Sequence, residues 1–251
     1  MIFTIVKKEL RSYFLDPVGY IVMGLFISIT GYIFYNLLIS FVENTQNIPG
    51  MYRSGLDFVN HVTIQLFTNI NLFLLIFAPI LTMRSFSSEK KNGTLDLYFS
   101  SQVSDLEIVL AKYIGALIKG GVLLLITFIF PLILWTLKAP DFTFVFSGYL
   151  GLFLNLTAYL SLGLFASVCT SNQVVAAVVS YVGILFFWMI SWASQVSSNY
   201  LYANIFKYVS IVKHFETIAK GSLTLSSLCY FVSFNILFLV CIKVVLSSRK
   251  W

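Results

Sequence analysis

The chain has 251 residues, of which 59% are apolar and only 10% charged, and its mean hydropathy is +0.90. A water-soluble domain carries about 25% charged residues, so these charges could not cover the surface of a globule of this size. Composition therefore excludes an ordinary soluble domain and predicts an all-helical protein that crosses a membrane several times.

The net charge of +6 does not indicate nucleic-acid binding. Outside the apolar stretches, Lys and Arg form no patch with interleaved aromatic residues. They gather at the ends of those stretches, which is the pattern of membrane topology. We therefore expect the lipid bilayer, and no nucleic acid, as a partner.

A helix needs ~20 mostly apolar residues to cross a bilayer. Six segments meet this length: Val18–Ser40, Val62–Met83, Ile108–Leu137, Thr143–Cys169, Val174–Ala193 and Ser226–Leu246. Lys112 and Lys119 occupy the first turns of the third, which we therefore expect to begin in the cytosol. Pro79 and Pro131 are expected to kink the second and third helices. No Asp, Glu, Lys or Arg lies in the middle of a span, which argues against ion-coupled transport.

The distribution of Lys and Arg predicts the orientation. With a cytoplasmic N-terminus, eleven of these residues lie inside and five outside, as the positive-inside rule favours. Six crossings then return the C-terminus to the cytosol. The expected topology is N-in and C-in.

Residues 1–16 predict an amphipathic helix on the inner membrane surface. Apolar residues recur at steps of three and four, at Phe3, Val6, Leu10, Tyr13 and Phe14. Lys7, Lys8 and Arg11 share the other face, where they would meet lipid headgroups. The alternative is a merely basic N-terminal flank.

Residues 84–107 form the longest hydrophilic stretch on the inside, RSFSSEKKNGTLDLYFSSQVSDLE. Ser104 and Glu107 have the spacing of a capping box, which predicts that the third helix begins just after Ser104. A charged helix, a break and a newly capped helix would make a platform for a cytosolic partner. The alternative, at even odds from spacing alone, is a solvated connector.

Residues 194–225 are long but rich in Tyr, Phe, Ile and Val. This composition predicts short external helices, interfacial or re-entrant, between the fifth and sixth spans. No internal repeat or Pro/Gly linker divides the chain, so residues 1–251 are expected to form a single transmembrane domain.

Catalytic and metal-binding motifs are not found in the sequence. There is no Walker A motif, no G-x-S-x-G and no H-E-x-x-H, so we expect neither an enzyme nor a cofactor in this chain. His214 lies two residues from Glu216, a pair more typical of an interface than of a site.

Polar uncharged residues within the spans could line a translocation path, and the candidates are Gln65, Asn69, Asn155 and Asn235. Hydrogen bonding between helices is the favoured alternative.

Three stretches carry a resemblance to a known family. The opening KKELRSYFLDPVGYIV, the loop RSFSSEKKNGTLDLYFSSQVSDLEIVLAKYIGA and the late segment KHFETIAKGSLTLSSLCYF resemble the membrane subunits of type-2 ABC transporters. The DPVGY opening and the HFE…KG segment are most similar to permeases of the gliding-motility type. Gln102 departs from the family, in which many relatives have Pro.

The resemblance implies a permease subunit of an ATP-driven exporter in a bacterial inner membrane. Two permeases, identical or related, would pair and dock onto two copies of a separate ATPase, which would bind the ATP and magnesium. The implied contacts to the ATPase lie in the coupling segment 84–107, at Arg84, Glu89, Lys90, Lys91, Gly93, Thr94, Asp96, Ser101, Val103, Ser104 and Asp105.

Two other functions stay open at this point. One is a carrier or channel that works without an ATPase, and the other is a membrane scaffold or assembly subunit.

Overall fold

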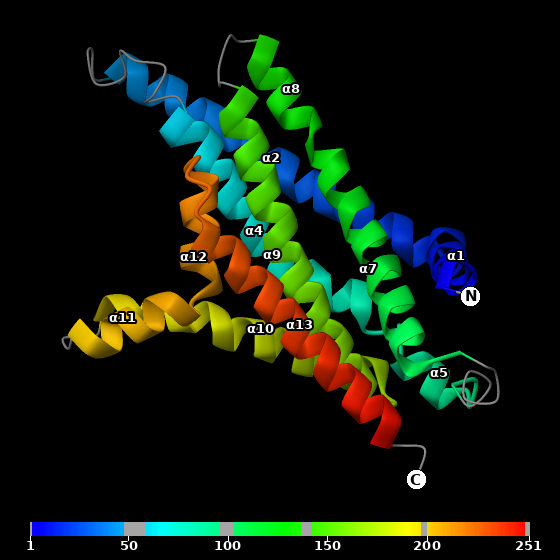
Figure 1. The fold of residues 1–251 in the computed structure, drawn as a ribbon. Coiled ribbons are helices and arrows are strands. Elements are labelled where there is room, and N and C mark those ends of the chain that lie inside the picture. Colours follow the sequence, from blue (N-terminus) through cyan, green and yellow to red (C-terminus); the bar gives the residue numbers. More distant parts are fainter. Residues whose placement is uncertain (1, 48–58, 96–102, 137–141, 197–199, 249–251) are drawn as a thin grey trace.

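The computed structural model describes residues 2–47, 59–95, 103–136, 142–196 and 200–248, and the elements in these ranges are helices (Figure 1). Six spans are long and apolar enough to cross a membrane. They contain the helices α2 (Pro17–Asn47), α4 (Gln65–Thr82), α7 (Asp105–Thr127) with α8 (Ile129–Thr136), α9 (Phe142–Cys169), α10 (Gln173–Val196) and α13 (Leu225–Ser247). The predicted all-helical class and its six apolar segments are confirmed; their orientation in a membrane stays a prediction.

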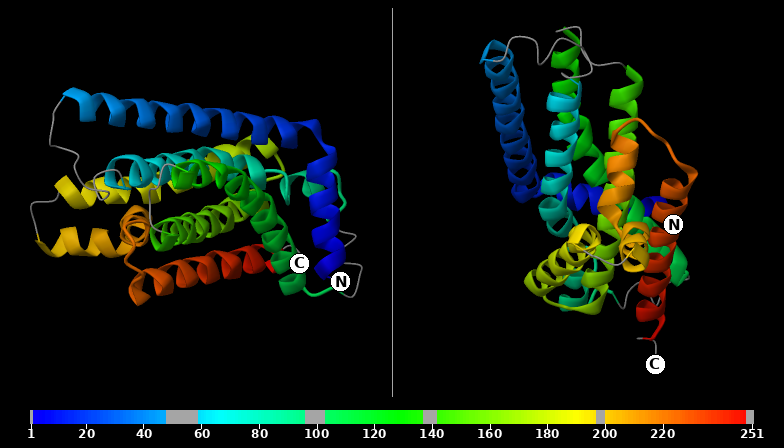
Figure 2. Two further views of the ribbon diagram at one scale, coloured as in Figure 1. Left: turned by 90° about the horizontal axis from the view of Figure 1, so that it is seen from above. Right: turned by 90° about the vertical axis from the view of Figure 1, so that its left-hand side faces the viewer.

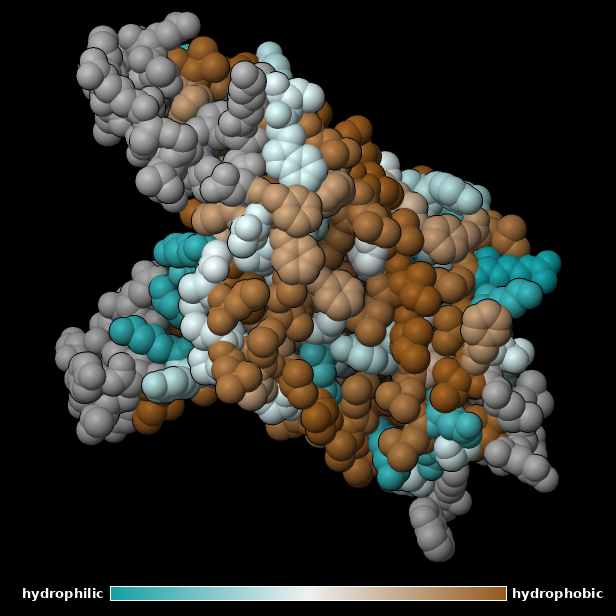
Figure 3. Space-filling model, turned by 45° about the horizontal axis from the view of Figure 1, so that its top comes forward, coloured by the Kyte–Doolittle hydropathy of each residue, from teal (hydrophilic) through white to brown (hydrophobic). Residues whose placement is uncertain are grey.

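The helix α9 forms the centre of the bundle. It packs against α4, α7, α10, α12 (Ile211–Ala219) and α13, and Figure 1 shows it between α4 and α13. Most of its residues are buried, whereas only a few residues of α2, α10 and α13 are. The exposed residues are largely apolar, and Figure 3 shows them covering most of one face, with hydrophilic patches mainly toward the edges. Such a surface suits lipid or another membrane subunit.

The third span begins as its sequence predicts. The Ser104 hydroxyl accepts a hydrogen bond from the Glu107 backbone N–H, and the Glu107 carboxylate accepts one from the Ser104 N–H. This capping box satisfies the free N–H groups that begin α7. The helix is interrupted at Phe128 and resumes as α8, because Pro131 cannot donate a backbone hydrogen bond to the preceding turn.

Short helices flank the spans. The helix α1 (Ile2–Leu15) lies roughly across the axis of α2 (Figure 2), and α5 (Ser87–Lys91) follows α4 after one turn. Both lie at the end of the bundle where α13 finishes (Figure 1). Residues 194–225 contain α11 (Tyr200–Val209) and α12, so the expected short helices exist, and their interfacial placement stays a prediction. A π-helical turn, η1 (Val59–Ile64), precedes α4.

Close helix packing at Gly163 gives a first prediction. A Cβ at this position of α9 would overlap the Thr82 hydroxyl of α4 and lie 3.1 Å from the Ser180 Oγ of α10. Gly163→Ala should therefore destabilise the fold by about 1–3 kcal/mol through overpacking, measured as a lower melting temperature in detergent. Gly121→Ala is the matched control, because its Cβ meets nothing within 4 Å. Equal melting temperatures for the two variants would contradict this packing.

Candidate functional site

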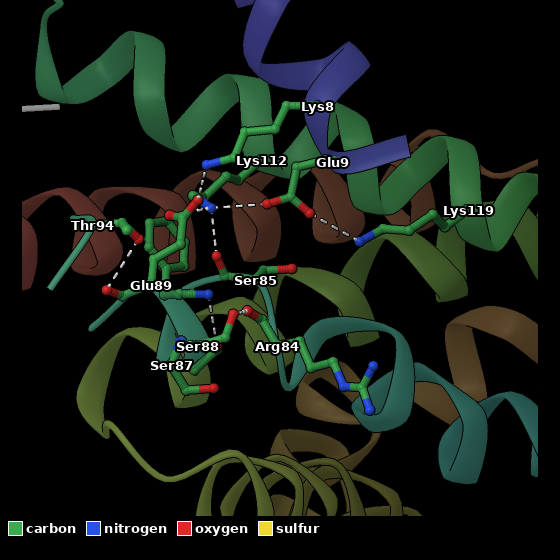
Figure 4. Close-up of polar contacts among 12 residues, drawn as sticks. Lys8, Glu9, Arg84, Ser85, Ser87, Ser88, Glu89, Thr94, Lys112 and Lys119 are labelled. Atoms are coloured by element: carbon green, nitrogen blue, oxygen red, sulfur yellow. Dashed lines mark hydrogen bonds and ion pairs between the residues drawn. The ribbon is translucent and has the colours of Figure 1, made fainter. Parts of the chain in front are cut away.

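Five charged side chains meet where α1, α5 and α7 come together (Figure 4). Ion pairs of 2.7–3.3 Å join them into one cluster. The members of this ionic cluster are Lys8 and Glu9 of α1, Glu89 of α5, and Lys112 and Lys119 of α7. The cluster therefore links the amphipathic N-terminal helix, the predicted coupling segment and the third span.

Lys112 is the centre of the cluster. Its side chain has no exposed surface, and its Nζ lies 2.8 Å from Glu9 Oε1 and 2.7 Å from Glu89 Oε2. It also donates a hydrogen bond to the Ser85 carbonyl, and its ammonium lies 4.9 Å from the centre of the Phe86 ring. A buried ammonium is tolerated when its charge and its N–H groups are matched in this way. One lysine of α7 thus holds α1 and the α4–α5 turn together.

Glu9 is seated over α7 between two lysines. Its carboxylate bonds Lys112 and, at 3.3 Å, Lys119. Gly115 lies between these lysines, and a Cβ there would come within 3.2 Å of the Glu9 Cβ, so the glycine permits the close approach. Burial alone would raise the pKa of Glu9, but the two lysines outweigh it and hold the pKa below its usual value.

Glu89 connects the cluster to the coupling segment. Its side chain is only 11% exposed, and besides Lys112 it bonds Lys8 at 2.9 Å. The backbone after α5 folds back on the same residue, because the Thr94 N–H donates to the Glu89 carbonyl and Gly93 adopts a positive φ of 68°. Only glycine adopts this conformation readily.

The helix α5 is also fixed to α9. The Ser167 hydroxyl accepts hydrogen bonds from the backbone N–H groups of Phe86 and Ser87, and it donates one to the Met83 carbonyl. A single buried hydroxyl therefore satisfies the first turn of α5 and the last turn of α4.

An ion pair outside the cluster joins the end of α4 to the α1–α2 junction. Arg84, after α4, pairs with Asp16 at the α1–α2 junction. The backbone N–H of Val18 donates to Asp16, and this hydrogen bond, with the Arg84 charge, holds the pKa of Asp16 below its usual value.

The residues expected to contact a partner differ in their surroundings. Arg84, Glu89 and Thr94 make the ion pairs and hydrogen bonds described above, and Lys90 is half-buried. Lys91 and Gly93 are exposed, whereas Asp105 begins α7, Ser104 caps it and Val103 precedes the cap. Asp96 and Ser101 lie outside the described residues.

Of the residues that define the predicted apolar face of the N-terminal helix, Val6 is buried but Phe3 is 79% exposed. Lys7, Lys8 and Arg11 are exposed. The opposite face packs mainly against α7, with Ile5 and Val6 buried. Much of the apolar face of α1 is therefore covered by protein, and its placement on a membrane surface stays a prediction.

The residues predicted for a translocation path separate into two pairs. Asn155 is fully buried and donates to Asn71 of α4. Asn235 donates to Thr157 of α9 and accepts from Tyr113 of α7. These contacts match the favoured alternative of hydrogen bonding between helices.

The other pair lies at the start of α4. Gln65 is exposed and Asn69 is half-buried. Asn69 donates to the Gln65 carbonyl of its own helix and lines a hollow of about 290 Å³ between α4, α10 and α12.

His214 is held by hydrogen bonds and ring stacking within the fold. Its Nε2 donates to the Tyr208 carbonyl, its Nδ1 lies 3.0 Å from the Ser227 Oγ, and its ring stacks on Tyr230. Glu216 pairs with Lys213 instead. Within the described ranges, no group of three His, Cys, Asp or Glu side chains could hold a metal ion.

The six long apolar helices make the chain an integral membrane protein. Residues 3–247 match the family described as ABC-2 family transporter protein, and the chain belongs to this family. It is therefore the membrane component of an ABC-2 transporter, a subunit without catalytic activity of its own. No curated protein matches the chain.

The cluster gives a second prediction, on stability. Glu9→Gln leaves Lys119 and one side of Lys112 without a counter-charge in a buried site, which should cost about 3–5 kcal/mol. Lys8→Gln removes a lysine whose side chain is 59% exposed, and its pair should contribute about 0–1 kcal/mol. The purified variants are heated in detergent, and their melting temperatures are compared from the fraction of protein that stays monodisperse. The cluster would have no structural role if both variants melted like the wild type.

Proposed function

We propose that the chain is the permease subunit of an ABC exporter and that residues 84–107 contact a separate ATPase. Family membership supports the ATP-driven transporter. The observation that supports the contact is the ionic cluster, because it ties α5 of this segment to α7, a helix long enough to cross the membrane. The ATPase would bind ATP and magnesium, and this chain would bind neither.

The cluster suggests how force passes from the ATPase to the spans. A push on Lys91 at the exposed end of α5, or on Gly93 in the turn after it, acts within four residues of Glu89. Glu89 pulls on Lys112 and therefore on α7, and Lys112 carries the displacement on to Glu9 and α1. Because the bonds are short and the lysine is buried, these elements move as one body.

The proposed assembly contains two permeases, identical or related, and two ATPases in a bacterial inner membrane. The exposed apolar faces of α2, α10 and α13 leave room for a second permease. The DPVGY opening and the HFE…KG segment still suggest the gliding-motility type within the family.

A third prediction separates contact from transmission. Lys91→Glu reverses an exposed charge at the end of α5, so it should reduce the amount of ATPase that co-purifies with the permease. Glu89→Gln breaks the buried link, so it should preserve co-purification but abolish the stimulation of ATP hydrolysis by the transported compound. Glu43→Lys, an exposed charge reversal at the far end of α2, is the control for both.

Two results would overturn the proposal. If no ATPase co-purifies with the wild-type permease, a carrier or scaffold becomes the better description. If Glu89→Gln transports normally, the ionic cluster transmits nothing.

A fourth prediction concerns orientation. Eleven Lys and Arg on one side against five on the other favour both ends of the chain in the cytosol. A fluorescent protein that matures only in the cytosol should therefore fluoresce when it is fused to the C-terminus. If a periplasmic phosphatase fused at the same position were active instead, the C-terminus would lie outside and the predicted topology would be wrong.

A further inference from the structure

The hollow between α4, α10 and α12 lies away from the ionic cluster. Thr68, Asn69 and Asn71 line it from the first half of α4, whereas α5 and the cluster follow the other end of that helix. Trp188 and Trp192 line it from the second half of α10, a helix that packs against both α4 and α12. Its volume of about 290 Å³ is at the small end of the range for ligand sites, which suits a ligand of a single ring.

One wall of the hollow is aromatic. Trp188 and Trp192 are four residues apart, so their side chains leave α10 on the same face. Both rings keep exposed surface, 38% for Trp188 and 63% for Trp192. Tryptophan at the end of a span commonly lies at the membrane interface, but that preference does not account for the polar side chains on the neighbouring walls. The rings and those side chains together have the composition of a ligand site.

The wall formed by α4 supplies both hydrogen-bond donors and acceptors. Asn71 is buried, and its carboxamide oxygen accepts a hydrogen bond from Asn155, so its nitrogen is the group that can donate to a ligand. Asn69 is the reverse case, because its nitrogen donates within α4 and its oxygen can accept. The Thr68 hydroxyl donates to the preceding turn and can also accept. A ligand that matches this wall must both donate and accept, as a hydroxyl group does.

The hollow carries no net charge. Among the described residues that line it, Glu216 alone is charged, and Lys213, which is not part of the lining, neutralises its carboxylate at 3.2 Å. A cation or an anion would therefore bring an unmatched charge into the site. An ammonium would also offer no acceptor to Asn71. These constraints favour an uncharged ligand.

We propose that this hollow binds an uncharged pyranose unit, with a C–H face of the sugar ring stacked on Trp188 and its hydroxyls bonded to Asn69 and Asn71. A pyranose meets the three requirements together, because its hydroxyls donate and accept, its C–H face is apolar and its ring carries no charge. As part of the transported compound, the sugar rests on the proposed export function, whereas its binding does not. A free sugar and the headgroup of a glycolipid offer the same chemistry, and the test separates them.

The test uses the full-length permease in lipid nanodiscs, without its ATPase and without sugar-based detergent. Saturation-transfer NMR measures the binding of three uncharged probes: methyl glucoside, methyl galactoside and methyl mannoside. At least one of them should bind, with the strongest transfer to the C–H protons of its ring. The anionic analogue methyl glucuronide should bind about tenfold more weakly than methyl glucoside, because its charge finds no partner in the hollow.

Variants of the aromatic wall locate the binding. Trp188→Leu removes the stacking ring and should weaken binding about three- to tenfold, whereas Trp188→Tyr keeps a ring and should restore most of the affinity. Trp135→Leu is the matched control, because Trp135 lies on α8 and does not line the hollow. It should change the affinity less than about twofold. Equal weakening in Trp188→Leu and Trp135→Leu would overturn the proposal.

A variant of the polar wall keeps the test decisive if Trp188→Leu does not fold. Asn69 is half-buried and its hydrogen bond stays within α4, so Asn69→Leu should keep the melting temperature of the wild type. It removes an acceptor from the hollow and should weaken sugar binding about three- to tenfold. Wild-type affinity in this variant would contradict the proposed contact.

Further probes separate the source of the sugar from other ligands. Tighter binding of octyl glucoside than of methyl glucoside, with no binding of an octyl polyether, would support the site and identify a glycolipid headgroup. Equal binding of the two octyl compounds would overturn it, because an apolar groove would explain both. Binding of tetramethylammonium but of none of the three methyl glycosides would also overturn it in favour of a cation site. The export function fails separately, if a sugar binds but does not stimulate ATP hydrolysis by the assembled transporter.

Discussion

The burial of one ammonium group organises the end of the bundle that holds α1 and α5. Lys112 has no exposed surface, so its charge must be met by protein, and it is met from three segments of the chain: Glu9 of α1, Glu89 of α5 and the Ser85 carbonyl before α5. The requirement explains several local features together. Gly115 lets α1 approach α7, Gly93 turns the chain back at α5, and Ser167 fixes α5 to α9.

The rest of the bundle is held by weaker and more adjustable contacts. Side-chain amides and hydroxyls, such as Asn235 between Thr157 and Tyr113, join the central helices, and pairs of this kind contribute about 0.6 kcal/mol in a membrane protein. The helices α2, α10 and α13 bury few of their residues, and those that they expose are largely apolar. The ionic cluster therefore lies next to spans that can shift against lipid or a partner at little cost in free energy. This arrangement suits the conversion of a local push into helix movement.

Hydropathy and capping chemistry predicted much of this architecture, because both depend on residues close together in sequence. The six spans and the start of α7 after Ser104 follow from such local patterns. The cluster did not, since Glu9 and Lys112 are 103 residues apart and neither has a local signature of its partner. Glu9 within a basic helix, and two lysines flanking Gly115, were the available signals. Glu89 was expected to face a partner, but the fold turns its carboxylate inward.

The order of the cluster along the chain has a consequence for biogenesis. A lysine opposes insertion into the bilayer, by about 2.5–3.5 kcal/mol at the centre of a helix and by less toward its ends, and the third span carries Lys112 and Lys119 in its first half. Glu9 is synthesised 103 residues before Lys112, and Glu89 also precedes it. The counter-ions are therefore already present at the membrane when α7 emerges, and the helix can neutralise its lysines as it enters. The counter-ions of the third span are thus synthesised before the span that needs them.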